Sequence, residues 1–220
     1  MTERRLEDDE RLLMASVGRG PDARSTDIES GAGAPRWLAS MIRFCSRCGE
    51  ELQLTTPPEE NRERMACVAC GHIAYVNPRL VVTTLPVDGD GNVVLIRRGI
   101  EPGYGSWAQP GGFLEVDETV GEGAVRETLE ETGLLVRPGE LIGMYSRLEA
   151  AVVTLVFEST VVGGEVRTSA ESLEVRAFRP EAIPWDEIAF KTSYWGIRDW
   201  VERRHPDVAL PDDFRGRERF

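Results

Sequence analysis

Short apolar runs separated by polar turns predict that the middle of the chain forms one sheet. Val, Ile, Leu and Phe are frequent in these runs, as is typical of strands. The sequence DGDGN at 88–92 has the composition of a tight turn, so the runs on either side of it are predicted to pair as a hairpin. The predicted strands cover residues 80–88, 93–98, 140–150, 151–163 and 174–178.

Two further segments complete this pattern. Tyr194, Ile197 and Val201 recur at helical spacing and predict a final helix over 192–204. Residues 101–112 are rich in Gly and Pro and are predicted to form a loop. The combination of strands and helices predicts an α+β domain.

The most informative predicted element is a helix that begins after Thr119 and ends at Gly133. Thr119 and Glu122 have the spacing of a capping box, and glycine is the preferred residue at a helix C-terminus. The helix is predicted to bury one face, which carries Val125, Thr128, Leu129 and Thr132.

The opposite face of this helix gathers carboxylates. At about 100° per residue, Glu127, Glu130 and Glu131 fall within roughly a quarter of a turn. Like charges four residues apart destabilise a helix, and so do the interior glycines Gly121 and Gly123. Bound hard cations would offset these costs, because Mg²⁺ prefers oxygen ligands. The alternative is an ordinary solvated acidic face.

Charge and composition limit the classes of partner. The 220 residues include 26 basic and 38 acidic residues, with a net charge of −12. Nonspecific nucleic-acid binding depends on clustered Lys and Arg, so a nucleic-acid partner is not expected. The N-terminus lacks the apolar stretch of a signal peptide, and no window approaches the roughly 20 apolar residues of a membrane span. These features predict a cytoplasmic protein without a membrane partner, and the polar residues 1–40 are predicted to be disordered.

The four cysteines predict a small zinc ribbon over residues 41–76. Cys45 and Cys48 form one CxxC pair, Cys67 and Cys70 form another, and 18 residues separate the pairs. This spacing is typical of a four-thiolate zinc site, whereas two disulfides or buried thiols are the alternatives. A zinc ion with four thiolate ligands has no open position, so its expected role is structural.

The acidic helix resembles the signature of the Nudix hydrolases over the 23 residues from Gly112 to Leu134. Thr128 departs from the usual aliphatic residue, and Gln109 from the usual apolar one. The resemblance implies an α/β/α sandwich with a mixed sheet, which would cover residues 77–206 and leave a C-terminal tail at 207–220. The matching positions are Gly112, Glu118, Arg126, Glu127, Glu130, Glu131, Gly133 and Leu134.

The resemblance also implies a site that holds Mg²⁺ or Mn²⁺. Arg126 is expected to orient the glutamates by ion pairing. Glu171, in the loop before the strand at 174–178, is a candidate catalytic residue. The implied metal ligands are Glu127, Glu130 and Glu131, assisted by Glu118 and by the carbonyl of Gly112.

Nudix enzymes hydrolyse a nucleoside diphosphate linked to another group. The zinc ribbon and several loop segments resemble a subgroup of ADP-ribose and FAD pyrophosphatases, while the segment after the motif is less like the NADH pyrophosphatases. The implied activity is release of AMP from ADP-ribose, FAD or NADH. A nucleotide sensor or binding module is the alternative, RNA cap removal is less favoured, and a homodimer is a common assembly in such enzymes. Candidate substrate contacts are Arg97, Arg98, Trp107 and Arg147.

Overall fold

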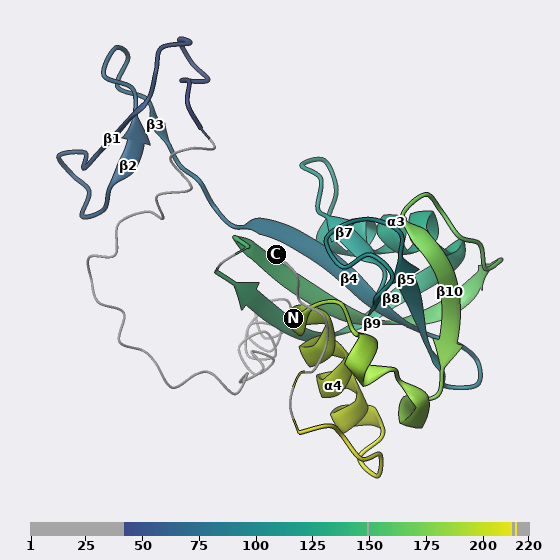
Figure 1. The fold of residues 1–220 in the computed structure, drawn as a ribbon. Coiled ribbons are helices and arrows are strands. Elements are labelled where there is room, and N and C mark those ends of the chain that lie inside the picture. The colour runs from purple at the N-terminus through teal and green to yellow at the C-terminus, as the bar shows by residue number, and fades with distance from the viewer. Residues whose placement is uncertain (1–41, 149, 213, 215–220) are drawn as a thin grey trace, which may run out of the picture. The chain divides into compact units, whose positions relative to one another are not determined.

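The computed structural model describes residues 42–148, 150–212 and 214 (Figure 1). They belong to two compact units, of which one ends at Pro78 and the other begins at Arg79. The segment 1–40, predicted to be disordered, lies outside the described residues. None of the helices in the described part of the chain is long and apolar enough to cross a membrane.

The smaller unit is a three-stranded antiparallel ribbon. Its strands β1 (Gln53–Thr55), β2 (Arg64–Ala66) and β3 (Ile73–Ala74) are hydrogen-bonded in that order. Among the residues of this unit that the structure describes, the buried apolar side chains form a cluster of four, which includes two of the cysteines. These residues are Cys45, Leu52, Met65 and Cys67.

The larger unit contains a mixed sheet in the order β10-β5-β4-β9-β8. The parallel pairing of β4 with β9 lies at its centre, and the other pairings are antiparallel. The strands are β4 (Arg79–Val87), β5 (Val93–Arg98), β6 (Trp107–Ala108), β7 (Gly111–Phe113), β8 (Leu134–Arg147), β9 (Val152–Gly164) and β10 (Ser172–Phe178).

The sheet is split between β4 and β5. These strands pair only where Val87 lies opposite Val93, at the hairpin end. Further along, β6 pairs with β5 and β7 pairs with β4. The prediction that 101–112 is entirely loop was therefore wrong, because its second half supplies backbone partners to both separated strands. The connection between β6 and β7 lies in the gap.

Two helices cover opposite faces of the sheet (Figure 1). Helix α3 (Val120–Thr132) contacts β4, β7 and β8, and α4 (Lys191–Arg204) contacts β8 and β9. The two faces alternate along β4: Thr84 bonds to Thr128 of α3 at 2.6 Å between hydroxyl oxygens, whereas Leu85 joins the core beneath α4. This arrangement confirms the predicted sandwich. Two 3₁₀ turns, Pro180–Ala182 and Trp185–Glu187, lead into α4.

The C-terminal segment predicted to be a tail contributes to the core in its described part. Val208, Leu210 and Phe214 pack against the cluster around α4. The Tyr194 hydroxyl donates a hydrogen bond to the carbonyl of Pro211 at 3.1 Å, and its ring lies edge-on to Phe214. These contacts attach the segment to the sandwich.

Candidate active site

Helix α3 has the predicted caps. The Thr119 hydroxyl accepts a hydrogen bond from the Glu122 backbone N–H, and the Glu122 carboxylate accepts one from the Thr119 backbone N–H. Gly133 ends the helix in the left-handed conformation. These caps fix the rotation of the helix and hence the direction of its acidic face.

The buried face of α3 differs from the predicted one. Thr128 and Thr132 are buried as predicted, but Val125 and Leu129 are only partly buried. Glu131 is 4% exposed instead. Its carboxylate accepts a hydrogen bond from the backbone N–H of Gly111 at 2.7 Å, which draws it into the gap in the sheet. Helical periodicity assigned Glu131 to the polar face, because periodicity contains no information about its hydrogen bond from the Gly111 backbone.

Arg126 holds the carboxylates in place, as the resemblance implied. It donates two parallel hydrogen bonds to Glu118, of 2.9 Å from Nε and 2.6 Å from Nη2, and a third of 2.7 Å to Glu127. It also lies 3.4 Å from a Glu130 carboxylate oxygen. The paired bonds from Arg126 lower the pKa of Glu118 to about 2, so Glu118 stays ionised.

Two glycines allow these carboxylates to approach closely. A Cβ atom at Gly112 would lie 2.5 Å from the carboxylate of Glu127, well inside van der Waals contact. A Cβ atom at Gly123 would lie 2.7 Å from a carboxylate oxygen of Glu118. The destabilising glycine at 123 therefore makes room for Glu118, which Arg126 holds.

Burial shifts the acid–base behaviour of two glutamates. Burial, reinforced by the charge of Glu127, raises the pKa of Glu131 to about 8, although its hydrogen bond from Gly111 opposes the shift. Burial also raises the pKa of Glu127, against the opposing effect of Arg126. Loss of solvent around the carboxylates of Glu127 and Glu131, and the repulsion between them, both disfavour their ionised forms. A bound divalent cation would offset these costs.

We predict that the metal-free protein becomes less stable as pH rises from about 5 to 8. The pKa of Glu131 is about 8 in the folded state and near 4.5 when unfolded, so in this range only the folded state keeps the proton. The free energy of unfolding then falls with rising pH, on the order of a few kcal/mol in total. Thermal melts should show this slope, and Glu131→Gln should flatten it. Mg²⁺ should raise the Tm more at pH 8 than at pH 5.5, and a pH slope unchanged by Glu131→Gln would contradict the assignment.

Glu171 comes close to the acidic face from the loop before β10. Its charge contributes to the raised pKa values of Glu127 and Glu131. The loop is fixed at both of its sides: the Gly99 N–H donates to the Glu171 carbonyl at 2.7 Å, and the Ser172 hydroxyl donates to the Glu131 carbonyl at 2.7 Å. The structure therefore brings Glu171 next to the glutamates of α3.

A cavity of about 810 Å³ adjoins these carboxylates, a size typical of sites for nucleotide-sized ligands. Several cationic and aromatic side chains share its wall with the glutamates. Arg98 stacks on Phe190 at 5.0 Å, and Arg79 on Phe113 at 4.3 Å. The predicted site residues that line it are Arg98, Gly112, Glu127, Glu130, Glu131, Arg147 and Glu171.

Three predicted site residues lie elsewhere. Trp107 is 4% exposed and packs edge-on against Phe178, with ring centroids 4.8 Å apart, so it belongs to the core. Arg97 donates a hydrogen bond to the Gly105 carbonyl at 3.0 Å and lies 4.0 Å from Glu174. Glu118 is engaged by Arg126 outside the set of residues that line the cavity. The substrate contacts predicted for Trp107 and Arg97 are not retained.

Sequence reasoning missed several residues that line the cavity. Arg79 lies opposite Val152 on β9, and Val152 lies opposite Arg147 on β8, so both arginines share one cross-strand row. No local motif signals this row, because β4 is distant in sequence from the neighbouring strands β8 and β9. Other residues missed are Phe113, Thr154, Phe190, Thr192 and Ser193, all of which line the cavity.

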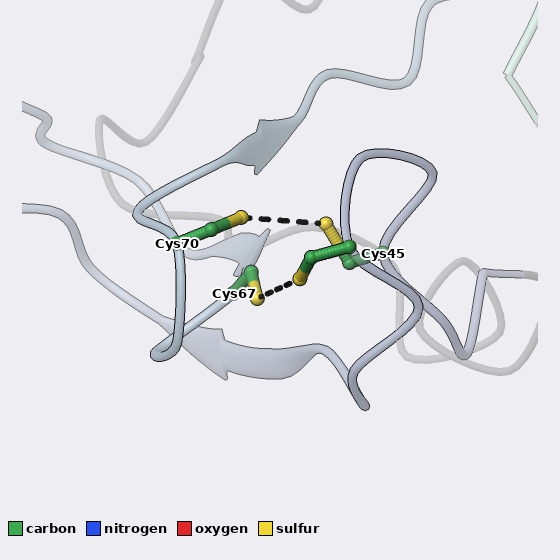
Figure 2. A group of neighbouring side chains, drawn as sticks. Cys45, Cys67 and Cys70 are labelled. Carbon is green, nitrogen blue, oxygen red and sulfur yellow. Dashed lines mark hydrogen bonds between the residues drawn. The ribbon is translucent and has the colours of Figure 1, made fainter.

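The cysteines of the ribbon converge on one point (Figure 2). Their four sulfur atoms lie within 4.8 Å of one another, with Sγ–Sγ distances of 3.7 Å for Cys45–Cys70 and 3.4 Å for Cys48–Cys67. Thiolates about 2.3 Å from a tetrahedral zinc ion are roughly 3.8 Å apart, so the cluster fits this ion. Gly49 and Gly71 adopt positive φ directly after each CxxC pair, where they close the tight turn, or knuckle, that carries the pair.

Comparison with known proteins shows the family. A model of the NUDIX domain matches residues 77–203, and a Nudix N-terminal zinc-ribbon model matches residues 43–76. This chain belongs to the Nudix hydrolase family and carries the N-terminal ribbon found in part of it. A crystal structure of a NUDIX hydrolase from Nitrosomonas europaea is similar, with a TM-score of 0.71 and 36% identity over 76% of this chain and 94% of that one.

Two curated relatives have named activities. The chain is 36% identical to an ADP-ribose pyrophosphatase of Methanocaldococcus jannaschii over 53% of its own length and 69% of the relative. It is 30% identical to the NAD-capped RNA hydrolase NudC of Pseudomonas aeruginosa over 64% of its own length. It spans about half of that second relative, 49%.

Proposed function

We propose that this Nudix hydrolase cleaves the pyrophosphate of a small nucleoside diphosphate compound and that ADP-ribose is its preferred substrate over FAD and NADH. The observation that carries the proposal is the convergence of Glu127, Glu130, Glu131 and Glu171 on a cavity of about 810 Å³ that also contains arginines. Cleavage of ADP-ribose by water at the pyrophosphate yields AMP and ribose 5-phosphate.

The donor set suits Mg²⁺ or Mn²⁺. Carboxylate oxygens of Glu127, Glu130 and Glu131, with the carbonyl of Gly112, would hold such an ion, and these hard oxygen ligands are those that Mg²⁺ and Mn²⁺ prefer. When bound, the metal supplies charge stabilisation for the phosphoryl oxygens and lowers the pKa of coordinated water. Zinc in the ribbon has the separate, structural role that four thiolates allow.

The residues of the chain have distinct proposed tasks around this centre. Arg126 fixes Glu127 through a 2.7 Å hydrogen bond, and the Gly111 N–H fixes Glu131. Glu171 is the candidate proton acceptor supplied by a separate loop. Arg98 and Arg147 provide positive charge for substrate phosphates on the cavity wall. The carboxylates would hold the metal ion and the arginines would hold the phosphates. Together the two groups could bind one complex of metal and pyrophosphate.

Two observations favour a compact substrate. The named activity of the Methanocaldococcus relative is ADP-ribose pyrophosphatase. The net charge of −12 also disfavours a long polyanion. The NudC relative keeps NAD-capped RNA as a second candidate, in which the same carboxylates would act on a pyrophosphate at the end of an RNA chain.

A substrate panel tests the proposal. We expect ADP-ribose to be hydrolysed with the highest kcat/KM, to require Mg²⁺ or Mn²⁺, and to give AMP and ribose 5-phosphate in equal amounts. The panel should contain ADP-ribose, FAD, NADH and NAD-capped RNA, with products separated by chromatography.

Other outcomes are distinguishable. Faster cleavage of NAD-capped RNA would favour the second candidate. Thermal stabilisation by ADP-ribose without any product would indicate a nucleotide sensor. Size-exclusion chromatography with light scattering on the same preparation tests the expected homodimer.

A further inference from the structure

Gln109 is a buried polar residue that also lines the cavity. It is 4% exposed and lies between the last residue of β6 and Pro110. The Pro110 carbonyl accepts a hydrogen bond from the Thr84 N–H at 3.0 Å, which fixes this segment against β4. The side chain therefore occupies a defined place in the gap of the sheet.

The surrounding hydrogen bonds determine which way the Gln109 amide points. The Thr83 hydroxyl has one proton, which it donates to the Leu155 carbonyl at 3.2 Å. Toward Gln109 the same hydroxyl must therefore accept, and Gln109 Nε2 lies 3.4 Å away as the donor. The network assigns the remaining atom, Gln109 Oε1, as an acceptor.

This acceptor has no hydrogen-bond partner among the residues that the structure describes. Leaving a buried carbonyl without a partner costs about 1–3 kcal/mol, and most such groups are paired in folded proteins. The fold gains only the long 3.4 Å hydrogen bond to Thr83 from this amide, whereas an apolar residue of similar size would fill the space without leaving a carbonyl unpaired.

The position of Gln109 indicates the kind of group that pairs with Oε1. It lies two residues before Gly111, whose N–H holds Glu131, so it is close to the carboxylates that would bind metal. A neutral acceptor pairs with a donor and not with a phosphate oxygen. In a nucleoside diphosphate compound the donors nearest to the pyrophosphate are the ribose hydroxyls, whereas base amines lie further away.

We propose that Gln109 is a substrate-recognition residue whose Oε1 accepts a hydrogen bond from a ribose hydroxyl next to the scissile pyrophosphate. This inference rests on the proposed function and adds to it a requirement for an intact ribose. It makes the enzyme selective for ribonucleotide over deoxyribose compounds at that position.

The experiment is a double-mutant cycle in which one change is made in the enzyme and the other in the substrate. Wild type and Gln109→Met are each assayed with ADP-ribose, with analogues that lack one ribose hydroxyl at a time, and with an analogue that lacks the base amine. We expect wild type to lose roughly 5- to 10-fold in kcat/KM on one of these analogues, as for the loss of one hydrogen bond. Gln109→Met should cleave that analogue and ADP-ribose at nearly equal rates, while its Tm stays the same or rises.

Gln53→Met is the matched control, because Gln53 is exposed on β1 of the ribbon; it should discriminate like wild type. A change in discrimination below twofold for every hydroxyl overturns the inference. The inference is also overturned if Gln109→Met changes discrimination only against the analogue that lacks the base amine. The same holds if Gln109→Met has a lower Tm and loses kcat/KM equally on all substrates. If wild type hydrolyses no compound of the substrate panel, the proposed function itself fails. If wild type hydrolyses ADP-ribose but shows no coupling to Gln109, only the inference about Gln109 fails.

Discussion

Glu127→Gln is expected to lower kcat by roughly 10²- to 10³-fold, the range seen when one electrostatic contact to a transition state is lost. Glutamine keeps the size of the side chain but removes the negative charge that would hold a divalent metal. The fold should tolerate the change, because Arg126 retains its two hydrogen bonds to Glu118. Steady-state hydrolysis of ADP-ribose with saturating Mg²⁺ measures the effect, and circular dichroism checks the fold.

Glu140→Gln provides the matched control for the loss of one carboxylate. Glu140 pairs with Arg203 and Arg204 on the surface of the sandwich and does not line the cavity. Its kcat should equal that of wild type. A Glu127→Gln enzyme within threefold of wild type would show that the metal is held elsewhere.

Loss of zinc is expected to unfold the ribbon while the sandwich stays folded. The ribbon has a buried apolar cluster of four residues, two of which are cysteines, so its own core contributes little. Structural zinc contributes roughly 10 kcal/mol or more to the folding of such small units. Cys67→Ser should abolish stoichiometric zinc in metal analysis and make residues 42–78 sensitive to limited proteolysis.

His72→Ala serves as the control for this experiment. His72 lies directly beyond the second knuckle, and its Nε2 is 3.4 Å from the Ser46 hydroxyl. The four thiolates already complete a tetrahedral set, so this variant should keep one zinc ion per chain. Loss of zinc from His72→Ala, or full zinc content in Cys67→Ser, would overturn the assignment of the ligands.

The caps and the carboxylates of α3 were predictable because they depend on local spacing. Thr119, Glu122 and Gly133 each act on residues within one or two turns, and the structure confirms these caps. The cysteine spacing was informative for the same reason, since each CxxC pair fixes its own knuckle. The strands around the DGDGN turn also matched their apolar runs closely.

The residues that sequence reasoning misplaced depend on partners far away in the chain. Glu131 is buried next to the backbone N–H of Gly111, the first residue of β7, and helical periodicity contains no information about that group. Trp107 has the composition of a stacking residue in a loop, yet pairing of β6 with β5 turns it toward Phe178. Arg79 joined the cavity through strand register, which one sequence does not reveal.

The parallel pairing of β4 with β9 has a consequence for the order of folding. The stretch from Gly112 to Gly133 needs only local contacts, so its turn, caps and Arg126 ion pairs form at low cost in loop entropy. The part of the cavity lined by Arg79 and Val152 instead requires β4 to pair with β9 across a long intervening segment. Chains rich in such distant pairings fold slowly. We therefore expect the acidic helix α3 to be assembled early in refolding and the cavity beside it to close last.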